Sequence, residues 1–182
     1  PRPLEGGGAG AGVMRSRESV PNARQLRRDQ TPQEQTLWFH LRRGNVDVDY
    51  VHVLDSGQPG PRVLVQALTH GNEICGAHAL VWLLALGFAP RRGRLTLSFA
   101  NIAAFETFDA EAPHRSRFVD EDLNRVWADA ELQGPRDSVE LRRARALRPF
   151  VDDADVVLDI HSMHEDCRPL MVCGTADKNA DY

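Results

Sequence analysis

Cysteine is scarce in this chain, which carries only Cys75, Cys167 and Cys173 among 182 residues. Their irregular spacing forms neither the framework of a disulfide-stabilised domain nor the Cys-x-x-Cys pair of a metal knuckle. This usage favours a reducing compartment, so we expect a cytoplasmic protein. Because Cys75 opens an apolar segment, we expect its thiol to pack inside the protein rather than to act as a nucleophile.

The sequence also lacks an excess of positive charge and a long apolar run. Lys and Arg number 22 against 26 Asp and Glu, for a net charge of −4, which gives no electrostatic reason to expect nucleic acid or a membrane as partner. The longest apolar stretch, residues 74–88, is interrupted by His78 and is shorter than the roughly 20 residues of a bilayer span. It predicts a buried helix.

No Gly-x-Ser-x-Gly elbow occurs, which argues against a serine hydrolase. We expect a small-molecule partner, and nothing in the sequence indicates an oligomeric state.

The first 45 residues divide into two segments. Residues 1–21 begin with a stretch rich in glycine, alanine and proline, and we expect them to be disordered. Residues 22–45 are basic, and Thr31 followed by Pro32 predicts a short helix that stops at Gly44. Residues 46–182 are long enough for one globular domain of ordinary size.

Residues 22–44 resemble the opening of a small endonuclease domain related to very-short-patch repair nucleases. The acidic and lysine residues that would hold that family's metal have no counterpart after Gly44, so we expect no nuclease activity. A basic amphipathic helix attached to the main domain is the simpler interpretation. A fusion or reading-frame junction near residues 44–48 is the alternative.

Strand-like and helix-like segments alternate after Gly44. Apolar runs at residues 63–68, 94–100 and 155–160 predict buried strands, and residues 169–172 are a candidate fourth strand. Helices are predicted at residues 74–87 and at a segment that opens at Asp137, with Glu140 three residues on, and ends near Phe150. Alternation of this kind predicts an α/β fold, a three-layer sandwich with a mainly parallel or mixed sheet.

Three common metal-binding side chains follow the ends of predicted strands. His70 and Glu73 come just after the strand at residues 63–68, and His161 directly follows the strand at residues 155–160. In open α/β sheets, ligands gather beyond the carboxyl ends of the strands. Two imidazoles and a carboxylate leave a fourth position open on a catalytic zinc ion. The trio of His70, Glu73 and His161 therefore has the composition and the placement of a zinc site. A histidine and a carboxylate three residues apart are by themselves more often ordinary surface or loop residues, and His52 and Asp55 form a similar pair.

Two neighbours of His161 leave alternatives open. His164 is either an alternative ligand or a loop histidine, and we favour His161 because it follows the strand directly. Asp159 shares a strand face with His161 by the two-residue period. It either orients an imidazole or fills a structural hydrogen-bonding role.

Residues 117–125, RFVDEDLNR, place two arginines and an asparagine in a loop-like stretch. A guanidinium group matches the planar geometry of a carboxylate. From residue types alone, a solvated charged loop is the better explanation.

The motifs HGNE (70–73), RFVDEDLNR (117–125) and DIHS (159–162), in this order and spacing, resemble the aspartoacylase and succinylglutamate desuccinylase branch of the zinc carboxypeptidase-like enzymes. The resemblance runs from about residue 47 to residue 174. It implies that Asn124 and Arg125 hold a substrate carboxylate and that Arg117 stabilises the oxyanion at the attacked carbonyl. For His70, Glu73 and His161 it implies ligation of one Zn²⁺ ion per chain.

By this resemblance, residues 46–182 form the N-terminal portion of a zinc hydrolase domain that cleaves the amide or ester bond of an N-acyl amino acid-like substrate. The family continues beyond the third ligand to a glutamate that activates water, so we expect a fold incomplete at the C-terminus. Glu165 lies too close to His161 to replace that glutamate. Loss of a general base costs about 10²–10⁴-fold in rate. The alternatives are a metallocarboxypeptidase and a catalytically impaired metal-binding fragment.

Overall fold

The structure, a computed structural model, describes residues 42–109, 111–163, 165 and 168–174. Arg42 and Arg43 are helical, and Gly44 follows with a φ of +57°, as expected of a glycine that ends a helix. The segment at residues 1–21 and the remainder of the predicted helix lie outside the described residues.

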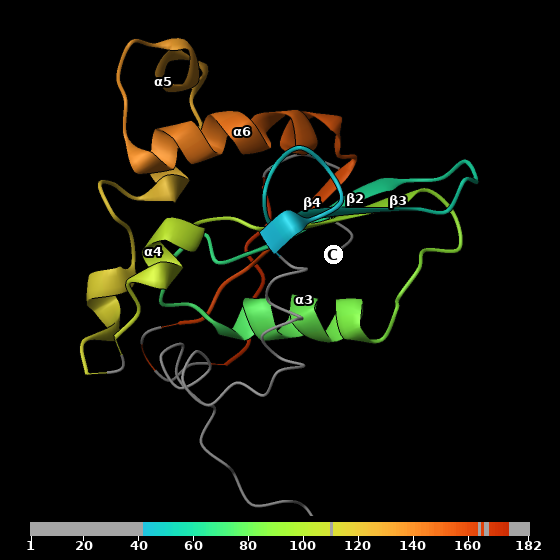
Figure 1. Cartoon of the computed structure of the whole chain (residues 1–182), viewed down its shortest axis with the longest axis horizontal. Helices are drawn as coiled ribbons and strands as arrows, with labels where there is room; N and C mark the ends of the chain where they lie inside the picture. Colours follow the sequence, from blue (N-terminus) through green and yellow to red (C-terminus); the bar gives the residue numbers. More distant parts are fainter. Residues whose placement is uncertain (1–41, 110, 164, 166–167, 175–182) are drawn as a thin grey trace, which may run out of the picture.

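A mixed sheet forms the centre of the protein (Figure 1). Its four strands are β1 (Val51–Asp55), β2 (Arg62–Ala67), β3 (Arg94–Phe99) and β4 (Val156–Ile160), in the spatial order β1-β3-β2-β4. Strand β2 runs parallel to both β3 and β4, whereas β1 runs antiparallel to β3. The carboxyl ends of β2, β3 and β4 therefore lie at the same end of the sheet.

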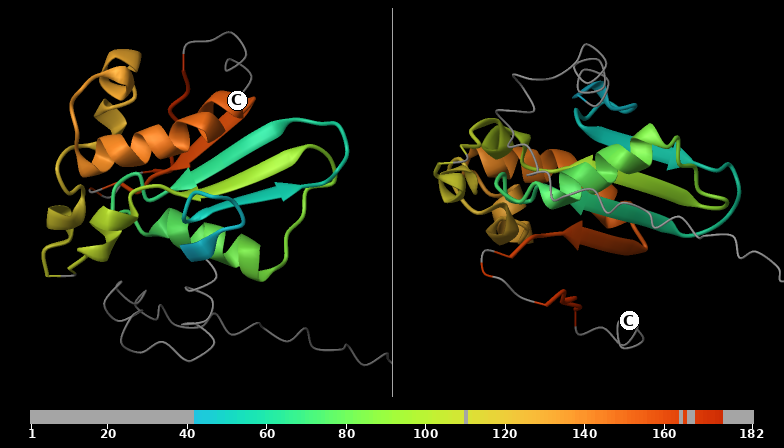
Figure 2. Two further views of the ribbon diagram at one scale, coloured as in Figure 1. Left: turned by 45° about the horizontal axis from the view of Figure 1, so that its top comes forward. Right: turned by 90° about the horizontal axis from the view of Figure 1, so that it is seen from below.

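Helices cover both faces of this sheet (Figures 1 and 2). Helix α3 (Cys75–Ala85) lies on one face and α6 (Val139–Asp153) on the other. Between β3 and α6, the chain forms α4 (Ile102–Glu106), 3-10 turns at Pro113–Ser116 and Leu123–Arg125, and α5 (Asp129–Gln133). This arrangement confirms the predicted three-layer α/β sandwich with a mixed sheet.

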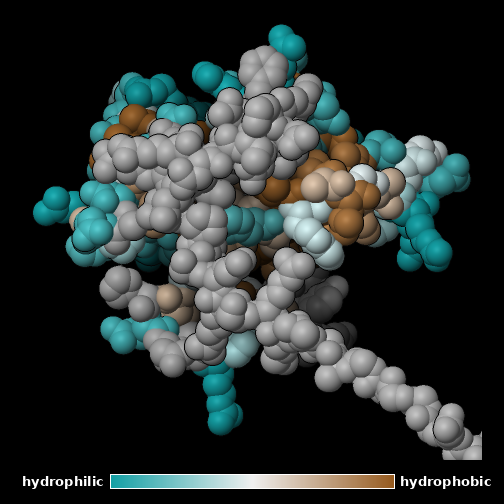
Figure 3. All heavy atoms as spheres, turned by 60° about the horizontal axis from the view of Figure 1, so that its bottom comes forward, coloured by the Kyte–Doolittle hydropathy of each residue, from teal (hydrophilic) through white to brown (hydrophobic). Residues whose placement is uncertain are grey.

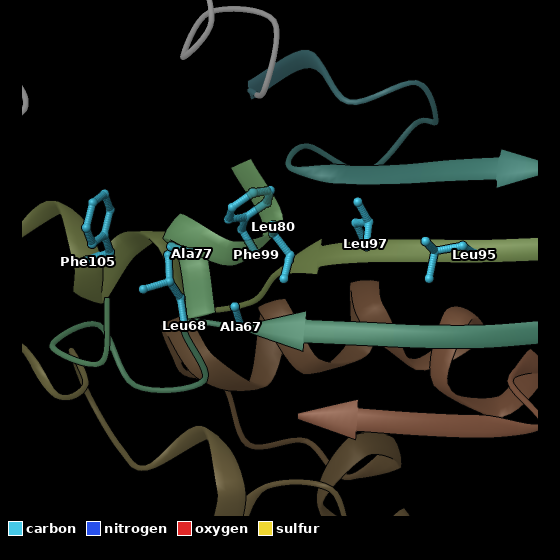
Figure 4. Close-up of a cluster of buried hydrophobic side chains, with 8 residues drawn as sticks. All are labelled: Ala67, Leu68, Ala77, Leu80, Leu95, Leu97, Phe99 and Phe105. Carbon is cyan, nitrogen blue, oxygen red and sulfur yellow. The ribbon is translucent and has the colours of Figure 1, made fainter. Parts of the chain in front are cut away.

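Two apolar clusters fill the interior. The first joins α3 and α4 to β2 and β3 (Figure 4), and its buried members are Ala67, Leu68, Ala77, Leu80, Leu95, Leu97, Phe99 and Phe105. The second joins α6 to β1 and to the loops before α6, through Val51, Ala100, Leu123, Val126, Leu132, Leu141, Ala144 and Leu147. Three-residue spacing in α6 places its members on one helix face. Full burial of each large side chain contributes about 1.5–3 kcal/mol.

Several apolar segments are more exposed than the sequence predicts. Helix α3 is an outer layer rather than a buried helix: Trp82 within the helix and Leu86 at its C-cap are 61% and 60% exposed. Strand β4 pairs within the described residues with β2 alone, so Val157 is also exposed. Residues 169–172 form no strand. Figure 3 shows a face on which hydrophobic and hydrophilic residues lie side by side. In the described part of the chain, no helix is long and apolar enough to span a bilayer.

Helix α6 begins one residue later than predicted. Ser138, rather than Asp137, is the N-cap, and its hydroxyl oxygen accepts a hydrogen bond from the Leu141 backbone N–H at 2.9 Å. The shift moves Glu140 from the capping position to a buried position inside the protein. The helix also continues beyond Phe150 to Asp153.

The buried Glu140 carboxylate accepts four hydrogen bonds. The donors are the backbone N–H groups of Val119 (2.7 Å), Asp120 (3.0 Å) and Glu121 (3.2 Å) and the Asn101 side-chain amide (3.0 Å). Burial raises the pKa of this carboxyl group. The four hydrogen bonds outweigh that effect, led by those from Val119 and Asn101. The pKa of Glu140 therefore lies below its ordinary value of 4.5.

This depressed pKa predicts a loss of stability in acid. Glu140 contributes stability that is fully present above the unfolded-state pKa, near 4.5, and is lost as the pH falls through the lower folded-state pKa. Between pH 6 and about pH 3, the free energy of unfolding should fall less steeply in Glu140→Gln than in the unmodified protein. Urea unfolding at a series of pH values measures the difference. Identical slopes would show that ionised Glu140 contributes nothing.

Candidate metal centre

The residue after β2 turns the chain sharply into the candidate site. Leu68 has a φ of +59°, in the left-handed region that bulky residues rarely adopt. Such a conformation costs about 1–3 kcal/mol, which the complete burial of the Leu68 side chain offsets. The Leu68 carbonyl accepts a hydrogen bond from the Asn101 N–H at 2.8 Å. The turn thus brings Thr69 and His70 to the end of the sheet.

Gly71 allows the next part of this loop to approach α4 closely. A Cβ at this position would lie 2.4 Å from backbone atoms of Ala104, Phe105 and Ser116. The Gly71 N–H donates to the Arg117 carbonyl at 3.1 Å. The glycine therefore joins the loop that carries His70 to the loop that carries Arg117.

Glu73 lies between the two predicted histidine ligands. Its Oε1 is 2.8 Å from His70 Nδ1, and its Oε2 is 2.8 Å from His161 Nδ1. His70 and Glu73 are only 2% and 6% exposed, while the side chain of His161 is 33% exposed. One ligand atom from each of the three residues lies within 4.8 Å of the others. The structure thus brings together the three residues that the sequence nominates for zinc.

A second carboxylate contacts the other nitrogen of each imidazole. His70 Nε2 is 3.1 Å from Asp122 Oδ1, and His161 Nε2 is 3.0 Å from Asp159 Oδ2. This leaves Nδ1 of both rings on the Glu73 side. Carboxylates in this position commonly fix the tautomer and orientation of metal-binding histidines.

Asp159 is itself held by a chain of hydrogen bonds. The Thr69 hydroxyl donates to its carboxylate, at 2.9 Å from Oδ1 and 2.8 Å from Oδ2. Gln66, the β2 residue in register with Asp159, donates from Nε2 to the Thr69 hydroxyl at 3.0 Å. Asp159 therefore both contacts an imidazole and takes part in a structural hydrogen-bond network, which were the two alternatives from the sequence.

The hydrogen bonds among these groups shift two pKa values in opposite directions. Burial raises the pKa of Glu73, but hydrogen bonds from His161 and His70 outweigh it and hold the pKa well below its ordinary value. Contacts with Asp159 and then Glu73 raise the pKa of His161 to about 10. The carboxylate of Glu73 is thus ionised and suited to a cation. Because a histidine ligand must be unprotonated, binding of a metal by His161 would release a proton.

The Arg117 side chain reaches the same group of residues. Its Nη1 donates to Glu73 Oε1 at 2.9 Å, and its Nη2 is 2.9 Å from His70 Nε2. The side chain is 39% exposed. Its guanidinium group therefore lies between the buried part of the candidate centre and solvent.

Asn124 and Arg125 are not brought against the candidate ligands. Both are exposed, and Arg125 Nη1 donates only locally, to the Asn124 carbonyl at 3.3 Å. The Asn124 N–H, however, donates to Asp122 Oδ1 at 2.8 Å, the same oxygen that lies near His70. The turn that carries both residues is thus tied to the candidate centre through Asp122.

Three further residues complete the comparison with the sequence. Asp122 has no predicted role, although an aspartate two residues before an asparagine is typical of a turn cap. Cys75 is exposed rather than buried, because Gly76 and Ala77 occupy the buried positions at the start of α3. Its thiol lies 3.7 Å from the His161 carbonyl. His164, the alternative ligand, lies outside the described residues.

Comparisons with known proteins agree with this architecture. A protein of Rattus norvegicus named N-acyl-aromatic-L-amino acid amidohydrolase (carboxylate-forming) is 33% identical over 117 residues, which cover 59% of this chain and 35% of the relative. The Homo sapiens protein of the same name is 34% identical over 115 residues, covering 58% and 34%. The solved structure of a succinylglutamate desuccinylase from Silicibacter sp. superposes with a TM-score of 0.50 at 27% identity, covering 62% of this chain and 32% of that one.

The chain spans about a third of the length of these relatives. A family model described as the succinylglutamate desuccinylase/aspartoacylase catalytic domain matches residues 59–181, about two thirds of the chain. The matched range includes all three candidate ligands and the loop from Arg117 to Arg125. The chain therefore belongs to the succinylglutamate desuccinylase/aspartoacylase family.

Proposed function

We propose that His70, Glu73 and His161 hold one zinc ion, and that the protein hydrolyses the amide or ester bond of an N-acyl amino acid-like substrate that bears a carboxylate. The observation that carries the proposal is the convergence of these three side chains to within 4.8 Å at the carboxyl ends of β2 and β4. The rat and human relatives, both named as N-acyl-aromatic-L-amino acid amidohydrolases, support the substrate class.

The residues present suit zinc. Two imidazole nitrogens and one carboxylate are a common donor set of catalytic zinc sites. Glu73 is ionised, and the two histidines are oriented by Asp122 and Asp159. When bound, zinc supplies Lewis acidity that activates water and polarises the scissile carbonyl.

The arginines have separate tasks in this proposal. Arg117, whose guanidinium lies 2.9 Å from both Glu73 and His70, is close enough to stabilise negative charge that develops on the carbonyl oxygen. Asn124 and Arg125 are exposed on a turn linked to His70 through Asp122, so they can receive the substrate carboxylate. A guanidinium group binds a carboxylate through two parallel hydrogen bonds.

The chain spans about a third of the length of the rat and human relatives. Hydrolysis is therefore proposed for the whole protein, whereas zinc and ligand binding can be tested on the chain itself. The exposed free thiols of Cys75 and Cys173 suit a reducing compartment, so a cytoplasmic location is part of the proposal.

The zinc-loaded chain provides the direct test. We expect about one zinc per chain by elemental mass spectrometry, and binding of N-acetyl-L-phenylalanine by calorimetry. A dipeptide with a free amino terminus is the comparison ligand, and we expect it to bind more weakly. Tighter binding of the dipeptide would favour the metallocarboxypeptidase alternative. A chain that binds no zinc would contradict the proposal.

Arg125→Ala is expected to weaken binding of N-acetyl-L-phenylalanine by about tenfold or more, because a hydrogen bond to a charged group contributes about 1.5–3 kcal/mol. Zinc content should not change. The matched control is Arg142→Ala, since Arg142 is exposed on α6 and paired with Asp137.

A second ligand shows whether Arg125 recognises the carboxylate. N-acetyl-L-phenylalaninamide lacks the negative charge, so Arg125→Ala should leave its affinity unchanged. Equal losses for the acid and the amide would show that Arg125 does not bind the carboxylate.

A further inference from the structure

The proposed function leaves the buried carboxylate of Glu140 without a task. This carboxylate is completely inaccessible and accepts hydrogen bonds from three successive backbone N–H groups, those of Val119, Asp120 and Glu121. These amides belong to the segment between Arg117 and the turn that carries Asn124 and Arg125. Glu140 itself lies in the first turn of α6, about 20 residues further along the chain.

The contact between this loop and α6 is reciprocal. While Glu140 accepts from the loop backbone, Asp120 Oδ2 accepts from the Val139 N–H at the start of α6, at 2.8 Å. Asn101, which donates to Glu140, also accepts from the Ala104 N–H at 3.2 Å and donates from its own N–H to the Leu68 carbonyl. The loop is therefore connected to the chain that leads from β2 into the candidate metal centre.

Apolar packing does not explain how this loop is held. Phe118 and Val119 are 41% and 42% exposed, so little hydrophobic burial fixes the residues directly after Arg117. Both ends of the loop nevertheless meet the candidate centre, since Arg117 contacts Glu73 and Asp122 contacts His70. Three hydrogen bonds to Glu140 hold the backbone in the middle of the loop, while the side chains of Asp120 and Glu121 contact Val139 and Arg136.

We propose that Glu140 is a positioning residue, which fixes residues 119–121 so that Arg117 and the Asn124–Arg125 turn are held in a preset arrangement beside the metal centre. The proposal rests on the proposed function, because that function gives the loop its ligand. Preset geometry matters because a displacement of about 1 Å can cost roughly 100-fold in reaction rate. Glu140 touches neither substrate nor metal and acts through the loop backbone.

Glutamine cannot replace Glu140 in this role. Each carboxylate oxygen accepts two of the four hydrogen bonds: Oε1 from Val119 and Asn101, and Oε2 from Asp120 and Glu121. A carboxamide has one acceptor oxygen, and its NH₂ group would face N–H donors. Glu140→Gln therefore changes the hydrogen bonding with little change in side-chain size.

The experiment compares Glu140→Gln with the unmodified zinc-loaded chain. Amide hydrogen exchange by NMR at residues 119–121 should become about 100-fold faster relative to amides of β2 and β3, because local protection depends on local hydrogen bonding. Zinc content should stay near one per chain. Affinity for N-acetyl-L-phenylalanine should fall about tenfold, whereas affinity for N-acetyl-L-phenylalaninamide should fall much less.

Leu80→Ala provides a control for general destabilisation. Leu80 is fully buried in α3, on the opposite face of the sheet from Glu140. This variant should lower stability while the exchange of residues 119–121 relative to the strands, and the preference for the acid over the amide, stay as in the unmodified chain.

The outcomes separate this proposal from the proposed function. Retained protection of residues 119–121 in Glu140→Gln, or an unchanged affinity for N-acetyl-L-phenylalanine, would overturn the positioning role. The same selective losses in Leu80→Ala would also overturn it. If the unmodified chain binds neither zinc nor the acid, the proposed function and the positioning role both fail, whereas intact binding with an unaffected loop in Glu140→Gln rejects the positioning role alone.

Discussion

Replacing His70 or His161 by alanine is expected to abolish zinc retention by the purified protein. Each change removes one of the three proposed protein ligands, so the zinc affinity should fall by more than the roughly 10–100-fold that loss of an outer hydrogen-bonding partner costs. The change also removes a hydrogen bond to the buried Glu73 carboxylate. Elemental mass spectrometry after dialysis, together with competition against a chromophoric chelator, measures the loss.

The control for this prediction is His114→Ala. His114 is an exposed histidine in the 3-10 turn at Pro113–Ser116 and is not among the three clustered residues. It should retain about one zinc per chain. Normal zinc retention by both His70→Ala and His161→Ala would remove the metal assignment, and with it the proposed function.

Gly71→Ala is expected to have the largest effect on the fold around the site. Its new Cβ would lie 2.4 Å from backbone atoms in two segments, one in α4 and one at Ser116. Backbone cannot move aside as a flexible side chain can, so overpacking should cost about 1–3 kcal/mol. The shift should also displace His70 and Arg117, which flank this contact. We expect a lower melting temperature and a zinc affinity reduced by about tenfold or more.

Gly57→Ala separates steric overlap from backbone preference. Gly57 has a φ of +69°, but a Cβ there would meet no atom within 4 Å. This variant should lose about 1 kcal/mol from the left-handed conformation alone and keep its zinc affinity. If Gly71→Ala and Gly57→Ala have the same melting temperature and the same zinc affinity, the close approach of the Gly71 loop to α4 is not needed for the site.

Short-range patterns in the sequence identify most of the elements that carry the site. The apolar runs locate β2, β3 and β4 to within one residue at each end, because a parallel strand between two helical layers requires continuous apolar residues. Strand β1 (Val51–Asp55) is not predicted, since its sequence VHVLD is short and interrupted by a histidine. Its pairing with β3 supplies what its own pattern lacks.

The exposure of these elements is harder to predict, because it depends on which neighbours cover them. Strand β4 and the buried strand β2 have similar sequences, VVLDI and RVLVQA. Their burial differs because β2 has a partner on both sides and β4, in the described part of the chain, has one. In the same way, the apolar sequence of α3 does not reveal that only one of its faces meets the sheet.

The sequence alone predicts the alternation of strands and helices, the histidines and the glutamate at strand ends, and the family motifs. Each of these is a property of residues that are neighbours in the chain. Only the tertiary structure shows that Asp122 contacts His70 and that Asp159 contacts His161. It also shows that Glu140 accepts hydrogen bonds from a loop about 20 residues earlier in the chain. These contacts depend on parallel strand register and on a one-residue shift in the start of α6. Because hydrogen bonds form only at specific distances and directions, residue types alone do not specify them.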